Sequence, residues 1–253
     1  MAQGPYDCLY LSPHLDDAIL SCAGQISLRT REGRSVLIYT AMAAEQVPSP
    51  LQANGARFLK LCGLGPDAGR VRRAEDARAC ARVGAKPDHG DLPEAVYRCD
   101  ASGRELYPTH ESLFEAIRPE DEGLMDRLAR SFGALPRAAA VFAPLGAGGH
   151  VDHVLVRRAA EQVFGAGLSY YEDYPYAVCR DVVRRLTQPR RAWSTVVVKL
   201  DAGARRARAA AILEYASQWP MLFGSRAAFR WRDGWRLWLH GGERLWRRAS
   251  SGS

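Results

Sequence analysis

The chain has 253 residues, of which 47% are hydrophobic and 25% charged, and its formal net charge is +7. These proportions are ordinary for a globular domain and exclude a collagen-like or largely disordered chain. We expect a single domain over residues 1–253, disordered at its end over residues 248–253. Because no signal peptide and no apolar run of membrane-spanning length is present, we expect a cytoplasmic location.

Strand-like and helix-like segments alternate along the chain. Apolar, often β-branched runs predict strands at residues 7–11, 35–40, 86–91, 138–143, 168–171 and 191–200. Apolar residues at helical spacing predict helices at residues 16–31, 52–61, 72–84, 111–132 (broken near Pro119), 151–164 and 202–217. This alternation predicts a Rossmann-like, three-layer α/β fold with a mainly parallel sheet. In such a fold the ligand site lies beyond the carboxyl ends of the strands.

Two segments show no clear period. Residues 94–110 predict a long loop, and the tail from residue 218 onward carries every tryptophan except Trp193 among many arginines. We expect both segments to shape the pocket and the tryptophans to be packing anchors. The run FRWRDGWRLWLHGGERLWRR, residues 229–248, also admits contact with a membrane surface, but we do not expect such contact.

The basic surplus consists almost entirely of arginine, since lysine occurs only at Lys60, Lys86 and Lys199. The arginines are spread along the chain and no nucleic-acid-binding signature is present, so we expect no nucleic-acid partner. The six cysteines form no CxxC pair. In a chain without a secretion signal they are expected to be reduced core thiols.

The segment SPHLDDAIL, residues 12–20, places one histidine and two adjacent aspartates where a strand gives way to a helix. Asp16 and Asp17 fall at the helix start, where backbone N–H groups and the helix dipole favour negative charge. An N-cap role explains one aspartate. It explains His14 and the second carboxylate poorly, because adjacent carboxylates raise each other's pKa. A bound cation would relieve that repulsion.

The segment APLGAGGHVDHVLVRRA, residues 143–159, has the same order of features: an apolar strand, a Pro/Gly turn and polar residues at a helix start. Taken alone, His150, Asp152 and His153 also fit a capped helix with two surface histidines. The chain has six histidines, however, and His14 occupies the matching position after another predicted strand. If the two strands are parallel in one sheet, the two segments converge on the same edge.

Together the two segments predict a metal site. Imidazoles and carboxylates without thiolates suit Zn²⁺ or a similar divalent ion, and three protein ligands with one open position is the catalytic pattern. We expect His14, Asp17 and His153 to be the ligands. Asp16 then lies beside the ion without binding it, as a general base. His150 is placed to stabilise an oxyanion or to protonate a leaving amine.

SPHLDDAIL and GGHVDH resemble the signature motifs of the PIG-L/LmbE-like deacetylases, zinc-dependent enzymes that remove N-acyl groups from amino sugars. The family's first motif usually has Pro and Glu where this chain has Leu15 and Ala18, and neither departure touches a ligand or the base. The stretches RRAEDARACARVGA, DLPEAVYR, YYEDYPYA and YASQW are also similar to family sequences. The resemblance therefore covers most of the chain.

The resemblance implies the ligands, base and electrophilic partner named above, and it adds three residues. Asp152 is expected to orient a histidine, Arg72 to contact the substrate, and Glu94 to face the sugar, although an ordinary loop carboxylate accounts for Glu94 equally well. Some family members carry a tyrosine just before the second motif, where this chain has Gly148 and Gly149.

A tyrosine that assists the transition state must therefore come from elsewhere in the chain. Tyr97, Tyr171 and Tyr174 are the candidates.

The expected activity is hydrolysis of an N-acetyl or other N-acyl group from an amino sugar or glycoconjugate by zinc-activated water. Three alternatives stay open. The first is a zinc amidase acting on a non-sugar N-acyl compound or a thiol conjugate. The second is a sugar- or nucleotide-binding module without catalysis, and the third is a membrane-peripheral deacetylase of a lipid-linked sugar.

Overall fold

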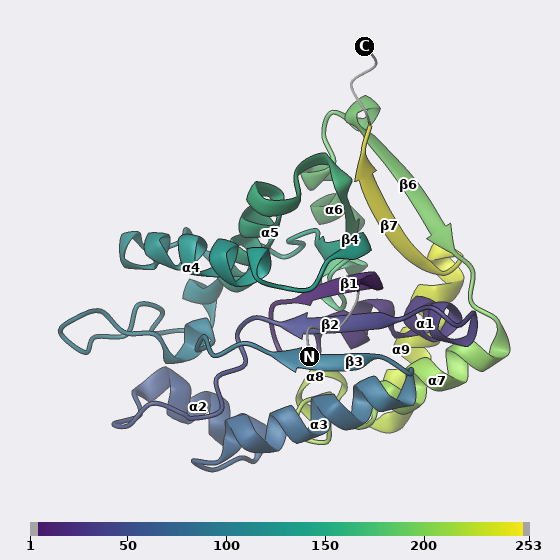
Figure 1. Ribbon diagram of the computed structural model, residues 1–253. Helices are drawn as coiled ribbons and strands as arrows, with labels where there is room; N and C mark the ends of the chain where they lie inside the picture. The colour runs from purple at the N-terminus through teal and green to yellow at the C-terminus, as the bar shows by residue number, and fades with distance from the viewer. Residues whose placement is uncertain (1–4, 250–253) are drawn as a thin grey trace.

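The computed structural model describes residues 5–249 as a central seven-stranded sheet between layers of helices (Figure 1). The strand order is β3-β2-β1-β4-β5-β7-β6. The parallel strands are β1 (Tyr6–Ser12), β2 (Val36–Thr40), β3 (Lys86–His89), β4 (Ala138–Pro144) and β5 (Leu168–Tyr171). At the edge, β7 (Glu243–Arg248) runs antiparallel to both β5 and β6 (Trp193–Val198). The prediction of a three-layer α/β fold with a mainly parallel sheet is confirmed.

Strand β1 feeds two hydrophobic cores because successive strand residues point to opposite faces of the sheet. Cys8 and Tyr10 pack with residues of α1 (Asp17–Arg31), α3 (Ala68–Arg82) and α7 (Ala202–Ile212). Leu9 and Leu11 pack with α4 (Glu122–Gly133) and α5 (Val151–Phe164) on the other face. A strand covered on both faces must be apolar throughout, which explains the unbroken run CLYL.

The winding of the chain creates a crevice beside β1. From β1 the chain passes outward to β2 and β3, and it then returns to place β4 on the other side of β1, where Tyr10 pairs with Phe142. Ligands bind at such a reversal of strand order, beyond the carboxyl ends of the strands. The segments after β1 and β4 are the two that carry the histidine and aspartate motifs.

Most predicted elements are present, and the departures lie between residues 111 and 132, between residues 180 and 186, and in the tail. The predicted helix over 111–132 is broken before α4 into two 3₁₀ turns, Glu111–Phe114 and Pro119–Asp121. Sequence patterns did not predict α6 (Arg180–Leu186), α8 (Trp219–Phe223), α9 (Arg226–His240) or β7, whereas α2 (Ala53–Cys62) was predicted.

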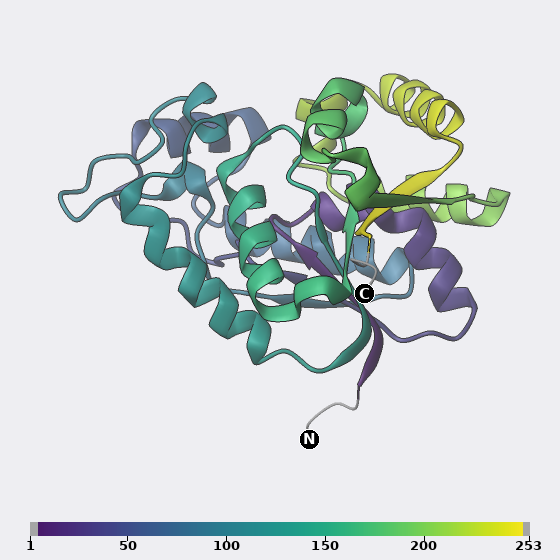
Figure 2. The ribbon, with the colours of Figure 1, turned by 90° about the horizontal axis from the view of Figure 1, so that it is seen from above.

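Figure 2 shows α9 at the periphery of the molecule, away from the sheet's centre. Residues 1–4 and 250–253 lie outside the described residues. Most of residues 248–253, the end predicted to be disordered, therefore lies outside them too, although Arg248 is the last residue of β7. Of the helices within residues 5–249, none combines the length and the apolar composition needed to cross a membrane.

Candidate metal centre

The two polar segments meet at the carboxyl ends of β1 and β4, which are parallel neighbours. His14 Nδ1 lies 3.1 Å from Asp17 Oδ2, and His153 Nε2 lies 3.2 Å from the same oxygen. All three side chains are buried, and one ligand atom from each falls within 4.8 Å of the others. The three residues predicted as ligands therefore form a group that can hold one ion.

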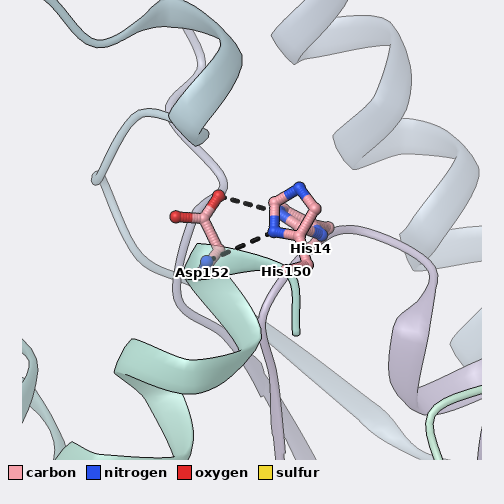
Figure 3. A group of neighbouring side chains, drawn as sticks. All are labelled: His14, His150 and Asp152. Atoms are coloured by element: carbon pink, nitrogen blue, oxygen red, sulfur yellow. Dashed lines mark hydrogen bonds and ion pairs between the residues drawn. The ribbon is translucent and has the colours of Figure 1, made fainter. Parts of the chain in front are cut away.

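Each of the two imidazoles is hydrogen-bonded to a buried carboxylate through the ring nitrogen that faces away from Asp17. His14 Nε2 lies 2.9 Å from Asp152 Oδ2 (Figure 3), and His153 Nδ1 lies 2.6 Å from Asp173 Oδ1. A carboxylate fixes the ring proton on the nitrogen it faces and leaves the other nitrogen as a lone pair for a metal. Among residues 5–249, His153 Nε2 is buried without any hydrogen-bond partner. Two such nitrogens and a carboxylate suit a divalent ion.

A second group, His14, His150 and Asp152, is equally close-packed, but its atoms are already engaged. Figure 3 shows both histidines on one side of Asp152, which contacts His14 through its carboxylate and His150 through its backbone N–H. The same carboxylate accepts hydrogen bonds from Arg98 Nη1 at 2.6 Å and Ala95 N at 2.8 Å. The first group therefore has the donor atoms that are freer to hold an ion.

Asp152 is an ionised, fully buried anchor for this network. Burial alone would raise the pKa of its carboxyl, but the Arg98 guanidinium and His14 hold that pKa well below its usual range. Arg98 is in turn paired with Asp121 at 2.8 Å. Asp152 thus contacts His14 on one side and Arg98 on the other.

Asp16 is freed from capping α1 by a neighbouring serine. Ser12 Oγ accepts the N–H of Ala18 at 3.0 Å and donates to the carbonyl of His14 at 2.7 Å. Asp16 occupies the N-cap position of the helix, but within the described residues its side chain forms no capping hydrogen bond. The interpretation of the Asp16 carboxylate as a capping group is therefore wrong. Burial and the adjacent Asp17 raise the pKa of Asp16 to about 7. That value suits a group that takes up and returns a proton near neutral pH.

His150 caps α5, because its Nδ1 accepts the backbone N–H of Asp152 at 3.2 Å. The alternative interpretation of this segment, a capped helix with two surface histidines, is therefore correct about the cap. It is wrong about the histidines, because His150 and His153 are only 7% and 1% exposed. Burial, together with the nearby His14, lowers the pKa of His150 well below its ordinary value. With Nδ1 accepting, the neutral ring carries its proton on Nε2 and is a hydrogen-bond donor.

The centre opens into a cavity of about 480 Å³. Arg72 and Glu94 form an ion pair in its wall, and Arg72 Nε is buried without a hydrogen-bond partner among the described residues. The predicted loop contributes Glu94, Val96 and His110 to the wall, and the tail contributes Gln218, Met221 and Leu222. Both segments thus shape the pocket, although no tryptophan within residues 5–249 lines it.

The tail tryptophans differ from one another in burial. Trp246 is fully buried and donates its Nε1–H to Glu172 at 2.8 Å, so it is a packing anchor as predicted. Trp231, Trp235 and Trp238 are largely exposed. For these three residues the prediction of packing anchors is wrong.

None of the three candidate tyrosines lines this cavity within residues 5–249. Tyr171 donates its hydroxyl to the Leu11 carbonyl, Tyr174 is buried in the core, and Tyr97 lines a separate cavity. Tyr176 lines the site instead. Its ring centroid is 5.6 Å from that of His153.

Gly148 makes room for Tyr176. Its φ is +88°, and a Cβ there would lie 2.8 Å from the Tyr176 Cβ and Cγ. Tyr176, Asp173 and Arg98 were all missed by the sequence reasoning. The first two lie in YYEDYPYA, a segment noted only for its similarity to the family, and nothing in its local pattern separates Asp173 from an ordinary loop carboxylate.

Comparisons with known proteins match this chain to one family. The family model described as PIG-L, GlcNAc-PI de-N-acetylase, matches residues 9–164. A 2'-N-acetylparomamine deacetylase of Streptomyces fradiae is 32% identical over 179 residues, which is 69% of this chain but only 59% of that protein. The deacetylase of the same name from Niallia circulans is 25% identical over 251 residues, covering 89% of this chain and 86% of that protein.

Solved structures extend the likeness to the whole fold. The crystal structure of the zinc-inhibited form of a teicoplanin deacetylase matches with a TM-score of 0.80 and 27% identity, covering 97% of this chain and 99% of that one. These relatives are named deacetylases, which supports the predicted N-deacetylase activity on an amino sugar. The His/Asp cluster and the zinc-inhibited form of this neighbour suggest a metal site.

Proposed function

The chain belongs to the PIG-L family, the GlcNAc-PI de-N-acetylases, and from this premise we propose that it is a Zn²⁺-dependent hydrolase that removes an N-acetyl or other N-acyl group from an amino sugar. The observation that carries the proposal is the buried group of His14, Asp17 and His153, whose two imidazoles are each held by a carboxylate on the outer nitrogen. The deacetylases among its relatives support the reaction class.

His14 Nδ1, Asp17 and His153 Nε2 are the proposed ligands. A divalent ion held there would polarise an amide carbonyl and make water a better nucleophile at neutral pH. Zn²⁺ is favoured because the donors are two imidazoles and one carboxylate without a thiolate, the set found in catalytic zinc sites.

Asp16 is proposed to move the proton of the reaction. It accepts a proton from water as the water oxygen adds to the acyl carbon, and it returns that proton to the nitrogen as the C–N bond breaks. The products are a carboxylate and a free amine. The neutral His150 donates its Nε2–H to the former carbonyl oxygen, where negative charge develops.

Arg72 and Glu94 are proposed to bind the sugar. The unpaired N–H at Arg72 Nε is a donor for a ring hydroxyl or an acyl oxygen, and Glu94 is an acceptor on the same wall. A buried donor that is left unsatisfied by the protein is stabilised when a ligand supplies the acceptor. The remaining wall is partly apolar, with Phe58 and Leu113 among its residues. This mixed lining supports a glycoconjugate substrate.

The test is amine release from a panel of N-acetylglucosaminides and matched non-sugar N-acetyl amines. We expect release from the sugars, its loss after chelation and its return with Zn²⁺. Asp16→Asn should lower turnover by about a hundredfold or more, whereas Asp67→Asn, at an exposed pair with Arg70, should not. Metal-dependent release from the non-sugar amides alone would instead identify an amidase with the same site.

A further inference from the structure

Helix α9 is attached to the core by one face only. That face comprises Phe229, Asp233, Arg236, Leu237 and His240. Phe229 packs against the ring of Phe223, with centroids 5.1 Å apart, and Asp233 pairs with the fully buried Arg208 at 2.7 Å. These contacts hold the helix against the core by this face.

The opposite face carries a row of tryptophans. Trp231, Trp235 and Trp238 follow the i, i+4, i+7 spacing of one helix face and are 69%, 51% and 72% exposed. Neighbouring rings lie side by side, with centroids 6.4 Å and 5.0 Å apart. Large apolar side chains gathered in one exposed patch indicate an interaction surface.

The charge around these tryptophans is positive. Arg226, Arg230 and Arg232 are exposed on α9, and none of them forms an ion pair with the described residues. Asp233, the one acidic residue in the sequence of α9, is buried in its pair with Arg208. The exposed surface of the helix is therefore aromatic and cationic, which suits an anionic partner and disfavours a second copy of the same surface.

An arginine-lined cavity of about 640 Å³ adjoins this face. Leu239 lies one helical turn beyond Trp235 and lines the cavity, and Arg180 Nη2 donates to its carbonyl at 3.3 Å. The arginines in the wall are Arg180, Arg184, Arg190 and Arg244. Among residues 5–249, Asp181 is the one acidic residue that lines the cavity, and it is paired with Arg184 at 3.2 Å. Arg244 is paired with Glu172 at 3.3 Å, whereas Arg180 and Arg190 form no ion pair with the described residues. The cavity thus retains the positive charge of these two arginines, which suits phosphate groups.

We propose that the tryptophan–arginine face of α9 and the adjoining arginine-lined cavity bind the surface of an anionic phospholipid bilayer. Tryptophan is the side chain most suited to the boundary between headgroups and acyl chains, because one part of its ring system is apolar and its N–H is polar. Arginines beside it bind the lipid phosphates. The helix lies along the surface, as amphipathic helices with aromatic and basic residues do.

The test is co-sedimentation of the full chain with vesicles of phosphatidylglycerol and phosphatidylcholine, compared with vesicles of phosphatidylcholine alone. We expect binding to the anionic vesicles, weakened by high salt, and a blue shift of tryptophan fluorescence. Replacing Trp231, Trp235 and Trp238 together by serine should abolish both. Replacing Arg226, Arg230 and Arg232 by glutamine should weaken binding by about a hundredfold, because each arginine near an anionic surface contributes about fivefold.

A matched control removes three exposed arginines elsewhere, at Arg34, Arg70 and Arg104. It changes the net charge equally and should bind vesicles much better than the α9 arginine variant. Deacetylase turnover on a water-soluble substrate should be unchanged in every variant, which shows that the fold is intact and keeps this test separate from the proposed function.

Three results would overturn the proposal. One is equal binding by the wild-type chain and the triple-tryptophan variant. Another is equal loss of binding in the control and the α9 arginine variant. The third is a dimer that falls apart in the tryptophan variant while the wild type ignores vesicles, since the face would then be an interface between copies of this chain.

Discussion

Asp173 provides a sharp prediction because it holds His153 by a single short contact. Its Oδ1 faces His153 Nδ1 at 2.6 Å, and its Oδ2 accepts the N–H of Ala147 at 2.9 Å. In Asp173→Asn the amide oxygen can keep the bond from Ala147, and the amide NH₂ then faces His153. The histidine must accept there, so its proton moves to Nε2, the nitrogen that should bind the metal.

The expected effect is weaker Zn²⁺ binding by about a hundredfold, or about 2.7 kcal/mol, the upper end of what a residue behind a metal-binding histidine contributes. The assay is a competition titration against a chromogenic chelator at fixed pH. Urea unfolding of the metal-free chain verifies that the variant is folded. Asp67→Asn is the matched control on the surface. An unchanged Zn²⁺ dissociation constant in a folded Asp173→Asn chain would refute the reasoning.

Two further predictions concern the pocket. Gly148→Ala should lower the free energy of unfolding by about 2–4 kcal/mol, because the new methyl group adds a clash with Tyr176 to the cost of a positive φ. Gly33→Ala is the control, because Gly33 has a φ of +81° with nothing within 4 Å of an added Cβ, and it should show the smaller backbone cost alone. Equal losses of unfolding free energy for the two variants in urea would contradict the predicted clash with Tyr176. Glu94→Gln leaves the buried guanidinium of Arg72 without its counter-charge; we expect a loss of about 1–3 kcal/mol in the same measurement, and no loss would show that the pair is not formed.

The sequence predicts the centre of the fold because local and long-range requirements coincide there. The run around Tyr10 is apolar at every position, as a strand between two helix layers requires, and His14 and His153 follow two such strands. Because the carboxyl ends of parallel strands meet at the same edge of a sheet, the two motifs can be brought together without knowledge of any other contact. Local pattern and packing agree in this part of the chain, and the predicted helix over 151–164 and strand over 168–171 match α5 and β5 to the residue.

The parts that sequence reasoning missed depend on contacts between distant segments. Asp173 lies 20 residues from the histidine it holds, and no periodic pattern marks it. Strand β7 reads as a charged tail because it carries arginines near the sheet edge, yet its Trp246 is buried. In α9 the apolar stripe does not coincide with the buried face, since Trp231, Trp235 and Trp238 point outward while Asp233 is buried. A pattern rule that places apolar residues inside misreads such a helix.

The central claim is that two adjacent aspartates have different roles: Asp17 binds the metal, and Asp16 moves the proton. The most direct test is the Zn²⁺ content of Asp16→Asn and Asp17→Asn after reconstitution and dialysis, measured beside amine release. The account predicts that Asp16→Asn keeps the wild-type zinc content without turnover, whereas Asp17→Asn loses both. Zinc lost from Asp16→Asn and retained by Asp17→Asn, or retained equally by both, would contradict it.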